Sequence, residues 1–513
     1  MSLSEPLDSI LPPYSPELKE SEWIHTTSVT GPYGITASVK DWNEVIDWQE
    51  HHRSLTQGYY RLIPTPQVRE VTTRLEAQFP GFYAVAISSG ALAHKELKNA
   101  CEVSGNQTPI EYHVGLPLGL EVTSNHVLEF SSTAGQAGIV LTQQKKVAEL
   151  LFERNRRRGG ALSSRVAQDL LHGGAVEIDI REAENCAENL CEWEQADHAF
   201  FYPSGMAAVT AALEHVLTQE RNRMIVLGNV YRDTHLLLEE QPWAGIDVQT
   251  DFLDTHDHAG LKERIQDPSV AGVLIETITN PLIEIPDLPG IAAICKQAKV
   301  PLLVDSTMAG PLNATPLTLG AEVLIHSTSK YLSGQNTHGG GVILTSNAQR
   351  AESIHEAQQK TQNLLAPVEF SDLNKGIATY PERLNRFNQN GEAVADLLRN
   401  HPAVDTVFYA ADQRPEWLKG MAGVVSCELK DPSLEKVATF FDAPLPGILK
   451  APSLGSDRTL FCPYVLLAYY DKSDEYLRES NLSKTLLRFA MGSEENIQPI
   501  LDGIRDALDS LQK

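Results

Sequence analysis

The sequence predicts an α/β protein with a mostly parallel sheet, followed by a smaller α+β domain. From about residue 166, short apolar runs alternate with segments of helical periodicity, which is the pattern of strand–helix–strand units. Beyond about residue 400, strand patterns such as 404–409 and 424–429 occur with helices, notably one at 497–511. We therefore expect an N-terminal unit over residues 1–165, a large domain over 166–395 and a small C-terminal domain over 396–513.

The predicted strands of the large domain are short and almost entirely apolar, as expected for strands buried on both faces. They are expected at 199–202, 224–227, 270–276, 301–304, 323–325 and 341–344, with helices after the first strand to about Leu217 and at 291–298, 352–364 and 390–398. In the N-terminal unit we expect helices from Val68 to Phe79 and from Gln143 to Arg158, with a buried strand at 83–87. The arginines that close the second helix suit the negative end of its dipole and need no anionic ligand.

Composition limits the classes of partner. The 513 residues carry a formal net charge of −25, which opposes binding to nucleic acid or to an anionic membrane surface. No stretch approaches the roughly 20 apolar residues of a membrane span, and the first residues lack a basic start and an apolar core, so no secretory signal is expected. Six cysteines without a C-x-x-C pair indicate reduced thiols in the cytoplasm, and their spacing supports no metal site.

Lys330 and Asp305 give the clearest chemical signal. Lys330 lies in His326-Ser327-Thr328-Ser329-Lys330-Tyr331, directly after one predicted strand, and Asp305 ends another. Pyridoxal phosphate (PLP) needs these groups: an amine forms a Schiff base, a carboxylate keeps the pyridine nitrogen protonated, and hydroxyls bind phosphate. The alternative is a surface lysine after a core strand. We expect catalytic roles for Lys330 and Asp305, and cofactor binding by Ser327, Ser329, Lys330 and Asp305.

Two further segments fit a cofactor site. Ser204-Gly205-Met206 follows a strand and opens a helix, so its backbone can approach an anion at the helix N-terminus. The alternative is an ordinary strand–helix turn with a serine cap. Tyr231 follows the strand at 224–227 and can stack on a planar cofactor, or simply pack in the core.

Two polar residues fit the binding of a small ligand. Asn280 follows the strand at 270–276 and lies in Asn280-Pro281, either as a ligand donor at the carboxyl edge of the sheet or as an ordinary turn. Arg488 lies within the apolar run Leu486–Met491, where its planar guanidinium suits a carboxylate. The alternative for Arg488 is a buried structural ion pair.

In sequence order, these segments resemble the Cys/Met metabolism family of PLP-dependent enzymes, over roughly residues 175–513. The matching segments are S-G-M-A-A at Ser204–Ala208, the cofactor-stacking tyrosine at Tyr231, S-N-P-L at Thr279–Leu282, V-D-x-T around Asp305, S-x-T-K at Ser327–Lys330, S-L-G at Ser453–Gly455 and the carboxylate-binding arginine at Arg488. Thr279 replaces a serine of the family pattern, and Ser329 replaces a threonine. The resemblance implies the aspartate-aminotransferase-like PLP-dependent transferase fold type I, with a mostly parallel seven-stranded sheet. It also implies that Ser453, Asn280 and Arg488 bind substrate.

Within the family, the chain is most similar to the long, fungal-type cystathionine γ-synthases. The shared segments are L-P-P at Leu11–Pro13, I-S-S-R at Leu162–Arg165 and T-L-x-C-P-Y-x-L-L-A-x-Y at Thr459–Tyr470. The shorter enzymes of the family carry Y-S-R before S-G-M, supplied to the phosphate of a neighbouring subunit. Arg181 is the nearest counterpart, without the tyrosine, and Tyr59 and Arg61 have the same Y-x-R spacing. Which of these reaches a phosphate is left open.

The resemblance implies PLP-dependent γ-replacement in methionine biosynthesis, in which a homoserine ester and L-cysteine give cystathionine. Lys330 would then be the main general base and acid, with Tyr231 as a helper and Asp305 beside the pyridine nitrogen. Homoserine-ester sulfhydrylase and cystathionine or methionine lyase are the alternatives within the family, and a non-catalytic scaffold on a PLP fold is the alternative outside it. We expect small amino-acid substrates, a homodimer or homotetramer, and a cytoplasmic location.

Overall fold

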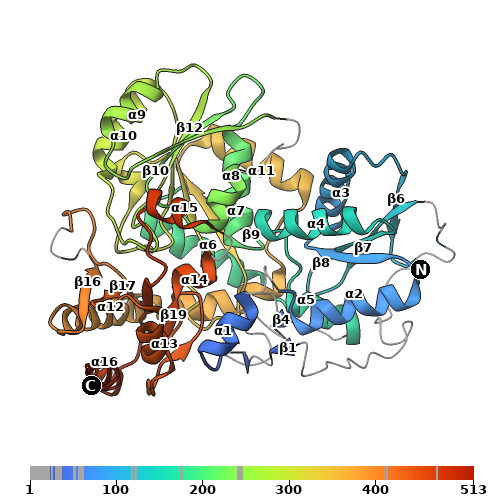
Figure 1. The fold of residues 1–513 in the computed structure, drawn as a ribbon. Helices are drawn as coiled ribbons and strands as arrows, with labels where there is room; N and C mark the ends of the chain where they lie inside the picture. The colour runs from blue at the N-terminus through green and yellow to red at the C-terminus, as the bar shows by residue number, and fades with distance from the viewer. Residues whose placement is uncertain are drawn as a thin grey trace.

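The computed structural model describes residues 37–49, 63–116, 124–173, 177–239, 246–409, 414–469 and 472–512, together with Leu120, Ala411 and three short strands named below. Three larger sheets organise these residues, one in each of three neighbouring lobes (Figure 1). The division into domains at residues 165 and 395 remains a prediction; both positions lie inside helices, at Ser164–His172 and Phe370–Arg399.

The largest sheet has seven strands and is mostly parallel, as expected. Its strands are β9 (His198–Tyr202), β10 (Arg223–Leu227), β11 (Gln249–Leu253), β12 (Val270–Glu276), β13 (Leu302–Asp305), β14 (Val323–His326) and β15 (Gly341–Thr345). They lie in the order β11-β10-β12-β13-β14-β15-β9, and β15 pairs antiparallel with both of its neighbours. Every residue of β12 is buried, because helices cover both faces of the sheet.

Two groups of helices cover the large sheet. The helices are α6 (Ile180–Glu194), α7 (Gly205–Val216), α8 (Arg232–Glu239), α9 (His258–Arg264), α10 (Leu288–Ala298), α11 (Ala348–Thr361) and α12 (Phe370–Arg399), with 3₁₀ turns at Pro316–Leu319 and Pro367–Glu369. Helices α7, α8 and α11 pack with Met224 and Val226 on one face. Helices α6, α9, α10 and α12 pack with Ile225 and Leu227 on the other. This alternation along β10 reflects the two-residue period of a strand.

The sequence prediction for α12 was too short. We expected a helix at 390–398, whereas α12 has 30 residues and contains Pro381. Proline normally interrupts a helix, because it lacks an N–H group and its ring crowds the preceding turn. Tertiary contacts hold this helix together: Leu373, Tyr380 and Phe387 are buried in the same core as the large sheet.

The N-terminal unit contains a four-stranded sheet with helices on both faces. The elements are α2 (Pro66–Gln78), β5 (Tyr83–Ile87), α3 (Gly90–Ser104), β6 (Ile110–Val114), β7 (Asn125–Ser131), β8 (Gln136–Thr142), α4 (Lys145–Arg158) and α5 (Ser164–His172). The strands lie in the order β5-β8-β7-β6. Helices α2 and α5 share one core with the sheet, and α3 and α4 share another. The predicted elements α2, β5 and α4 are therefore present.

Short elements near the N-terminus precede this unit. They are α1 (Trp42–Gln49), a parallel pair of β1 (Trp23–Ile24) and β4 (Ser54–Leu55), and an antiparallel pair of β2 (Thr27–Ser28) and β3 (Ala37–Ser38). Helix α1 lies against the C-terminal lobe (Figure 1), where the rings of Trp42 and Phe441 have centroids 6.0 Å apart. The N-terminal segment therefore contacts a part of the chain about 400 residues away.

The C-terminal lobe is an α+β unit, as predicted. Its strands are β16 (Val404–Phe408), β17 (Val424–Leu429), β18 (Leu449–Lys450), β19 (Leu460–Pro463) and β20 (Leu487–Ala490), in the order β16-β17-β20-β19-β18. Its helices are α13 (Leu434–Asp442), α14 (Tyr464–Ala468), α15 (Asp474–Glu479) and α16 (Gln498–Ser510). In the part of the chain that the structure describes, no helix is long and apolar enough to cross a membrane.

Candidate active site

A cavity of about 430 Å³ lies at the carboxyl edge of the large sheet. The sheet's parallel strands end together at this edge, which is where open α/β sheets bind ligands. Nine of the residues predicted from the sequence line the cavity: Gly205, Met206, Tyr231, Asn280, Asp305, Ser327, Lys330, Ser453 and Arg488. They come from segments spread over almost 300 residues, so the fold brings together most of the predicted site.

The N-terminus of α7 forms one wall of the cavity. Ser204 caps this helix: its buried Oγ accepts a hydrogen bond from the Ala207 N–H at 3.0 Å and donates one to the Gly159 carbonyl at 2.8 Å. A Cβ on Gly205 would lie 2.7 Å from the Cβ of Ser327, so the glycine allows the helix backbone to pack against the lysine loop. The Gly205 and Met206 N–H groups, which precede the capped Ala207 N–H, have no acceptor within the helix and can hold an anion.

The amine of Lys330 lies deeper in the cavity, against a strained loop. Its Nζ donates a hydrogen bond to Ser453 Oγ at 2.8 Å. The backbone of Ser453 has φ of 112°, a conformation that costs a non-glycine residue free energy. Gly455 has φ of 70°, and a Cβ there would overlap the backbone N of Tyr331. This glycine therefore allows the Ser453 loop to lie directly on the lysine.

A buried arginine shares the Ser453 loop with Lys330. Arg488 donates from Nη1 to Asn280 Oδ1 at 3.0 Å and from Nη2 to the Ser453 carbonyl at 2.7 Å. Its guanidinium carbon lies 4.3 Å from the ring centroid of Tyr464, and the Tyr464 hydroxyl accepts a hydrogen bond from Asn280 Nδ2 at 3.0 Å. Within the described residues, the buried Arg488 Nε has no hydrogen-bond partner. Arg488 is thus a fixed cation that lines the cavity, and its planar guanidinium suits a carboxylate.

Two carboxyl groups end neighbouring strands in this cavity. Glu276 of β12 and Asp305 of β13 are register partners in the parallel ladder. Burial raises the pKa of Asp305, opposed by hydrogen bonds from Thr307, whose N–H donates to Oδ1 at 2.9 Å. Burial and the neighbouring Asp305 charge raise the pKa of Glu276 well above its usual range. Glu276 Oε1 accepts the Tyr231 N–H at 2.6 Å, so this carboxyl group positions the tyrosine.

Some predicted residues are not brought into the cavity. Ser329 is fully buried and bonds Gly340 through both its hydroxyl oxygen and its hydroxyl proton. Ser204 likewise serves as the helix cap described above. Arg181 is an exposed residue of α6, 78% exposed at its side chain, and pairs with Asp179. Tyr59 and Arg61 lie outside the described residues.

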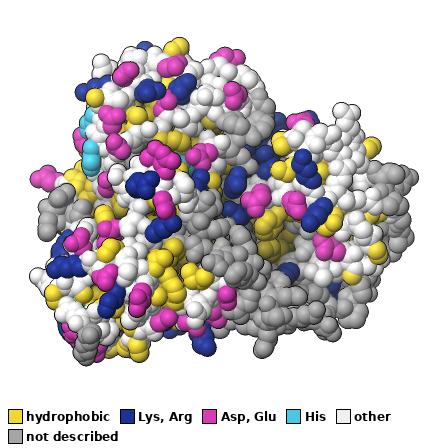
Figure 2. Space-filling model, in the orientation of Figure 1, with side chains coloured by type: hydrophobic (Ala, Val, Ile, Leu, Met, Phe, Trp, Pro, Cys, Tyr) yellow, Lys and Arg dark blue, Asp and Glu magenta, His cyan; other side chains and the backbone are white. Residues whose placement is uncertain are grey.

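Several lining residues were not predicted. Arg156 and Arg157, at the end of α4, line the same cavity as Gly205 and Met206. The sequence-based interpretation explained these arginines by the helix dipole; in the structure both also pair with Glu153, at 3.7 Å. Lysine and arginine side chains gather in the hollow between the large-sheet lobe and the N-terminal unit (Figure 2). Trp48 and Ile63 also line the cavity, and no sequence motif indicated them.

The end of α4 is fastened to the head of α7. Gly159 has φ of 76°, and a Cβ there would overlap Ser204 Oγ, so only glycine lets the two helix ends meet. Thr210 of α7 donates to the Arg158 carbonyl at 3.3 Å, and Arg158 pairs with Glu214 at 3.1 Å. The N-terminal unit therefore holds a fixed position beside the anion-binding end of the cavity.

A buried network joins the lysine loop to the N-terminal unit. Thr328 and His338 share a hydrogen bond of 2.8 Å, and the other ring nitrogen of His338 lies 3.2 Å from Glu369. Glu369 also accepts hydrogen bonds from Ser163 at 2.5 Å and from Arg165 at 2.9 Å. Burial opposes ionisation of Glu369, but the charge of Arg165 and the bonds from His338 and Ser163 lower its pKa to about 2.

The residues of the cavity fit PLP. The free first-turn amides of α7 and the hydroxyl of Ser327 suit its phosphate, the Asp305 carboxylate suits its ring nitrogen, and the Lys330 amine suits its aldehyde. A Cβ at residue 205 would occupy the space beside Ser327, so the sequence keeps that space open. The cavity thus offers a suitable protein group for each of the phosphate, the ring nitrogen and the aldehyde of the cofactor.

Comparison with known proteins gives the same result. The family model for Cys/Met metabolism PLP-dependent enzymes matches residues 182–509. The chain is 31% identical to cystathionine γ-lyase of Bacillus subtilis over 331 residues, covering 62% of this chain and 84% of that protein. It is 27% identical to cystathionine γ-synthase of Haemophilus influenzae over 368 residues, covering 69% and 96%. A crystal structure of cystathionine γ-synthase from Xanthomonas oryzae pv. oryzae, in complex with aminoacrylate and cysteine, superposes with a TM-score of 0.61 at 25% identity, covering 65% and 87%.

Proposed function

The chain belongs to the Cys/Met metabolism family of PLP-dependent enzymes, and we propose that it catalyses γ-replacement on a homoserine ester, with L-cysteine as the nucleophile and cystathionine as the product. Membership of the family confirms the expected cofactor and the expected PLP-dependent fold type I. The observation that carries the proposal is the joint placement of Lys330, Ser453 and Arg488 at one end of a cavity that has cationic residues at the other.

PLP, when bound, supplies an electron sink for charge that develops at the substrate Cα. Asp305 keeps the pyridine nitrogen protonated and thereby maintains this sink. The raised pKa of the buried Glu276 favours its neutral form, which limits the negative charge beside Asp305. The two carboxyl groups are thus given different roles by their environments.

Lys330 is the proposed general base and acid. Its Nζ takes the Cα proton of the substrate and returns it to another carbon during the replacement. The hydrogen bond to Ser453 Oγ holds the amine on the side of the cavity that Arg488 occupies. Tyr231 is the proposed stacking partner of the cofactor ring and an aid to proton transfer, fixed through its backbone by Glu276.

Arg488 is the proposed partner of the substrate α-carboxylate. Asn280 and the Ser453 carbonyl hold its guanidinium on two sides, so the fork enters the cavity in one orientation. A pre-oriented arginine binds a carboxylate with little further loss of side-chain entropy. The expected substrates are therefore small amino acids.

Arg156 and Arg157 are proposed to assist phosphate binding from within the same chain. They line the cavity beside the head of α7, whereas Arg181 lies on the exposed surface of this chain. Arg181 remains the candidate for a contribution to a second subunit in the proposed homodimer or homotetramer. We further propose a cytoplasmic location, supported by the six free thiols.

Turnover assays test the proposal. O-succinyl- and O-acetylhomoserine are each offered with cysteine or sulfide, and cystathionine and methionine are offered alone. Cystathionine formation from an ester and cysteine supports the proposal. Sulfide-dependent homocysteine formation alone, or elimination alone, would instead establish the sulfhydrylase or the lyase alternative. A purified protein that takes up no PLP would establish the non-catalytic scaffold.

A further inference from the structure

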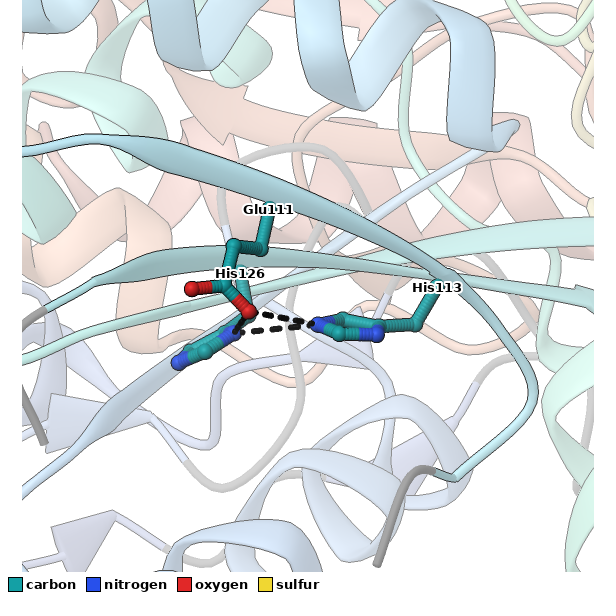
Figure 3. A group of neighbouring side chains, drawn as sticks. All are labelled: Glu111, His113 and His126. Atoms are coloured by element: carbon teal, nitrogen blue, oxygen red, sulfur yellow. Dashed lines mark hydrogen bonds and ion pairs between the residues drawn. The ribbon is translucent and has the colours of Figure 1, made fainter. Parts of the chain in front are cut away.

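We propose that the N-terminal unit binds one Zn²⁺ ion through Glu111, His113 and His126. These residues lie on β6 and β7, which pair in parallel with Glu111 opposite His126. His113 is two residues after Glu111 and so projects from the same face of β6. The three side chains converge on one point between the strands (Figure 3).

The distances between the ligand atoms suit a single ion. His113 Nε2 lies 3.2 Å from His126 Nδ1, and Glu111 Oε2 lies 3.5 Å from the first nitrogen and 3.8 Å from the second. Bond lengths of about 2.0–2.1 Å in a tetrahedral zinc site place neighbouring ligand atoms about 3.3 Å apart. Each observed edge is within roughly half an ångström of that value. Small side-chain rotations therefore complete three corners of a tetrahedron.

Neighbouring groups orient the ligands. Ser124 Oγ donates to Glu111 Oε1 at 2.7 Å, which leaves Oε2 directed at the two imidazoles. His126 is fully buried, and its ring lies 5.7 Å from that of Phe82, so its orientation is fixed by packing. Neighbouring groups that hydrogen-bond to the ligand side chains and fix their orientation are characteristic of metal sites. The ligand set itself, two imidazoles and one carboxylate, favours zinc and its transition-metal neighbours over magnesium or calcium.

The fourth coordination position faces solvent. The side chains of His113 and Glu111 are 23% and 40% exposed, so water or an external ligand reaches the ion. The sequence-based expectation of no metal rested on cysteine spacing and did not consider this set. All three residues lie before residue 182, where the family match begins, and none of them lines the PLP cavity, so the site is separate from the PLP chemistry. In the described sheet β6 is an edge strand that pairs with β7, and the ion would cross-link the two.

The competing interpretation is a metal-free hydrogen-bond cluster. One of the facing imidazole nitrogens would then carry a proton and donate it across the 3.2 Å contact. Both interpretations connect β6 to β7, but only the zinc site predicts a stoichiometric affinity for metal.

Titration calorimetry of the EDTA-treated, full-length holoenzyme with ZnCl₂ tests the proposal. We expect one Zn²⁺ per chain, and Co²⁺ in its place should give the visible absorption of a tetrahedral site. Glu111→Gln and His113→Gln should each weaken Zn²⁺ binding by at least about 10-fold, since even outer-shell changes have effects of this size. His94→Gln is the matched control, because His94 is an exposed histidine of the same unit outside the triad.

Both substituted side chains are partly exposed, so the variants should keep the fold, and circular dichroism checks this. The visible absorbance of bound PLP should be the same in all four proteins. Absence of stoichiometric Zn²⁺ binding by the unmodified chain would overturn the proposal in favour of the hydrogen-bond cluster. If Glu111→Gln and His113→Gln both bound Zn²⁺ as tightly as the unmodified chain does, the proposal would also be overturned, because the metal would then bind elsewhere.

Discussion

The acid stability of the fold should depend on Glu369, the central carboxylate of the buried network beside the lysine loop. Its pKa is about 2 in the folded chain, against an ordinary value of 4.5. Because the folded value is the lower one, the stabilisation is complete above the ordinary pKa and is lost as the pH falls towards the folded pKa. At about 1.4 kcal/mol per pKa unit, the ionised group contributes about 3 kcal/mol to the free energy of unfolding.

Glu369→Gln removes this charge and leaves Arg165 and the buried His338 without their shared anion. At pH 7 the variant should be less stable than the unmodified chain by about 3 kcal/mol. At pH 3 the difference should shrink to about 1 kcal/mol, because the carboxylate is then largely protonated when the chain unfolds. Urea unfolding of both proteins at the two pH values measures the difference. Glu356→Gln, on the exposed face of α11, is the matched control and should show no such trend. A difference between Glu369→Gln and the unmodified chain that stays constant from pH 7 to pH 3 would refute the assigned pKa.

Four substitutions test the catalytic site. Lys330→Ala should abolish γ-replacement and the borohydride-trapped attachment of cofactor, and turnover that survives would exclude Lys330 as the base. Arg488→Lys should raise KM for the amino-acid substrate roughly 10- to 100-fold, because a charged hydrogen bond contributes about 1.5–3 kcal/mol; an unchanged KM would place the α-carboxylate elsewhere. Arg157→Gln should weaken PLP binding, measured by cofactor titration, more than Arg181→Gln does. The reverse order would favour the residue on the surface of α6.

The interior strands of the large sheet could be predicted, because burial on both faces leaves a continuous apolar run. The edge strand β11 could not: Thr250 and Asp251 give it no such run. Strand β6 was missed in the same way, because it alternates polar and apolar residues at the rim of its sheet. Strands β7 and β8 were missed although they are mostly buried inside that sheet. An apolar run thus predicts many of the strands, whereas edge strands such as β6 and β11 give no such run.

The residues of the candidate site were also only partly predictable from local sequence. Asp305 and Lys330 follow apolar strands directly, so local sequence places them at the carboxyl edge of the sheet. Ser329 has the same local signal, yet its hydroxyl bonds Gly340, and only the folded loop shows this. Arg156 and Arg157 reach the cavity through the packing of α4 on α7, a contact between segments about 50 residues apart that no local pattern encodes.

Because Gly159 contacts Ser204 beside the cavity, binding of the cofactor should stabilise the packing of the N-terminal unit on α7. A ligand that binds between two packed bodies stabilises their association as well as each body, since it binds the assembled form alone. Loading the cavity should therefore protect the junction of α4 and α7 from proteolysis and hydrogen exchange. Conversely, a chain trimmed to the family-matched region would lose the cap acceptor at Gly159 and one wall of the cavity together. Trp48, Ile63, Arg156 and Arg157 thus contribute to the wall of the cavity, and shortening the protein from this end should change what the cavity can hold.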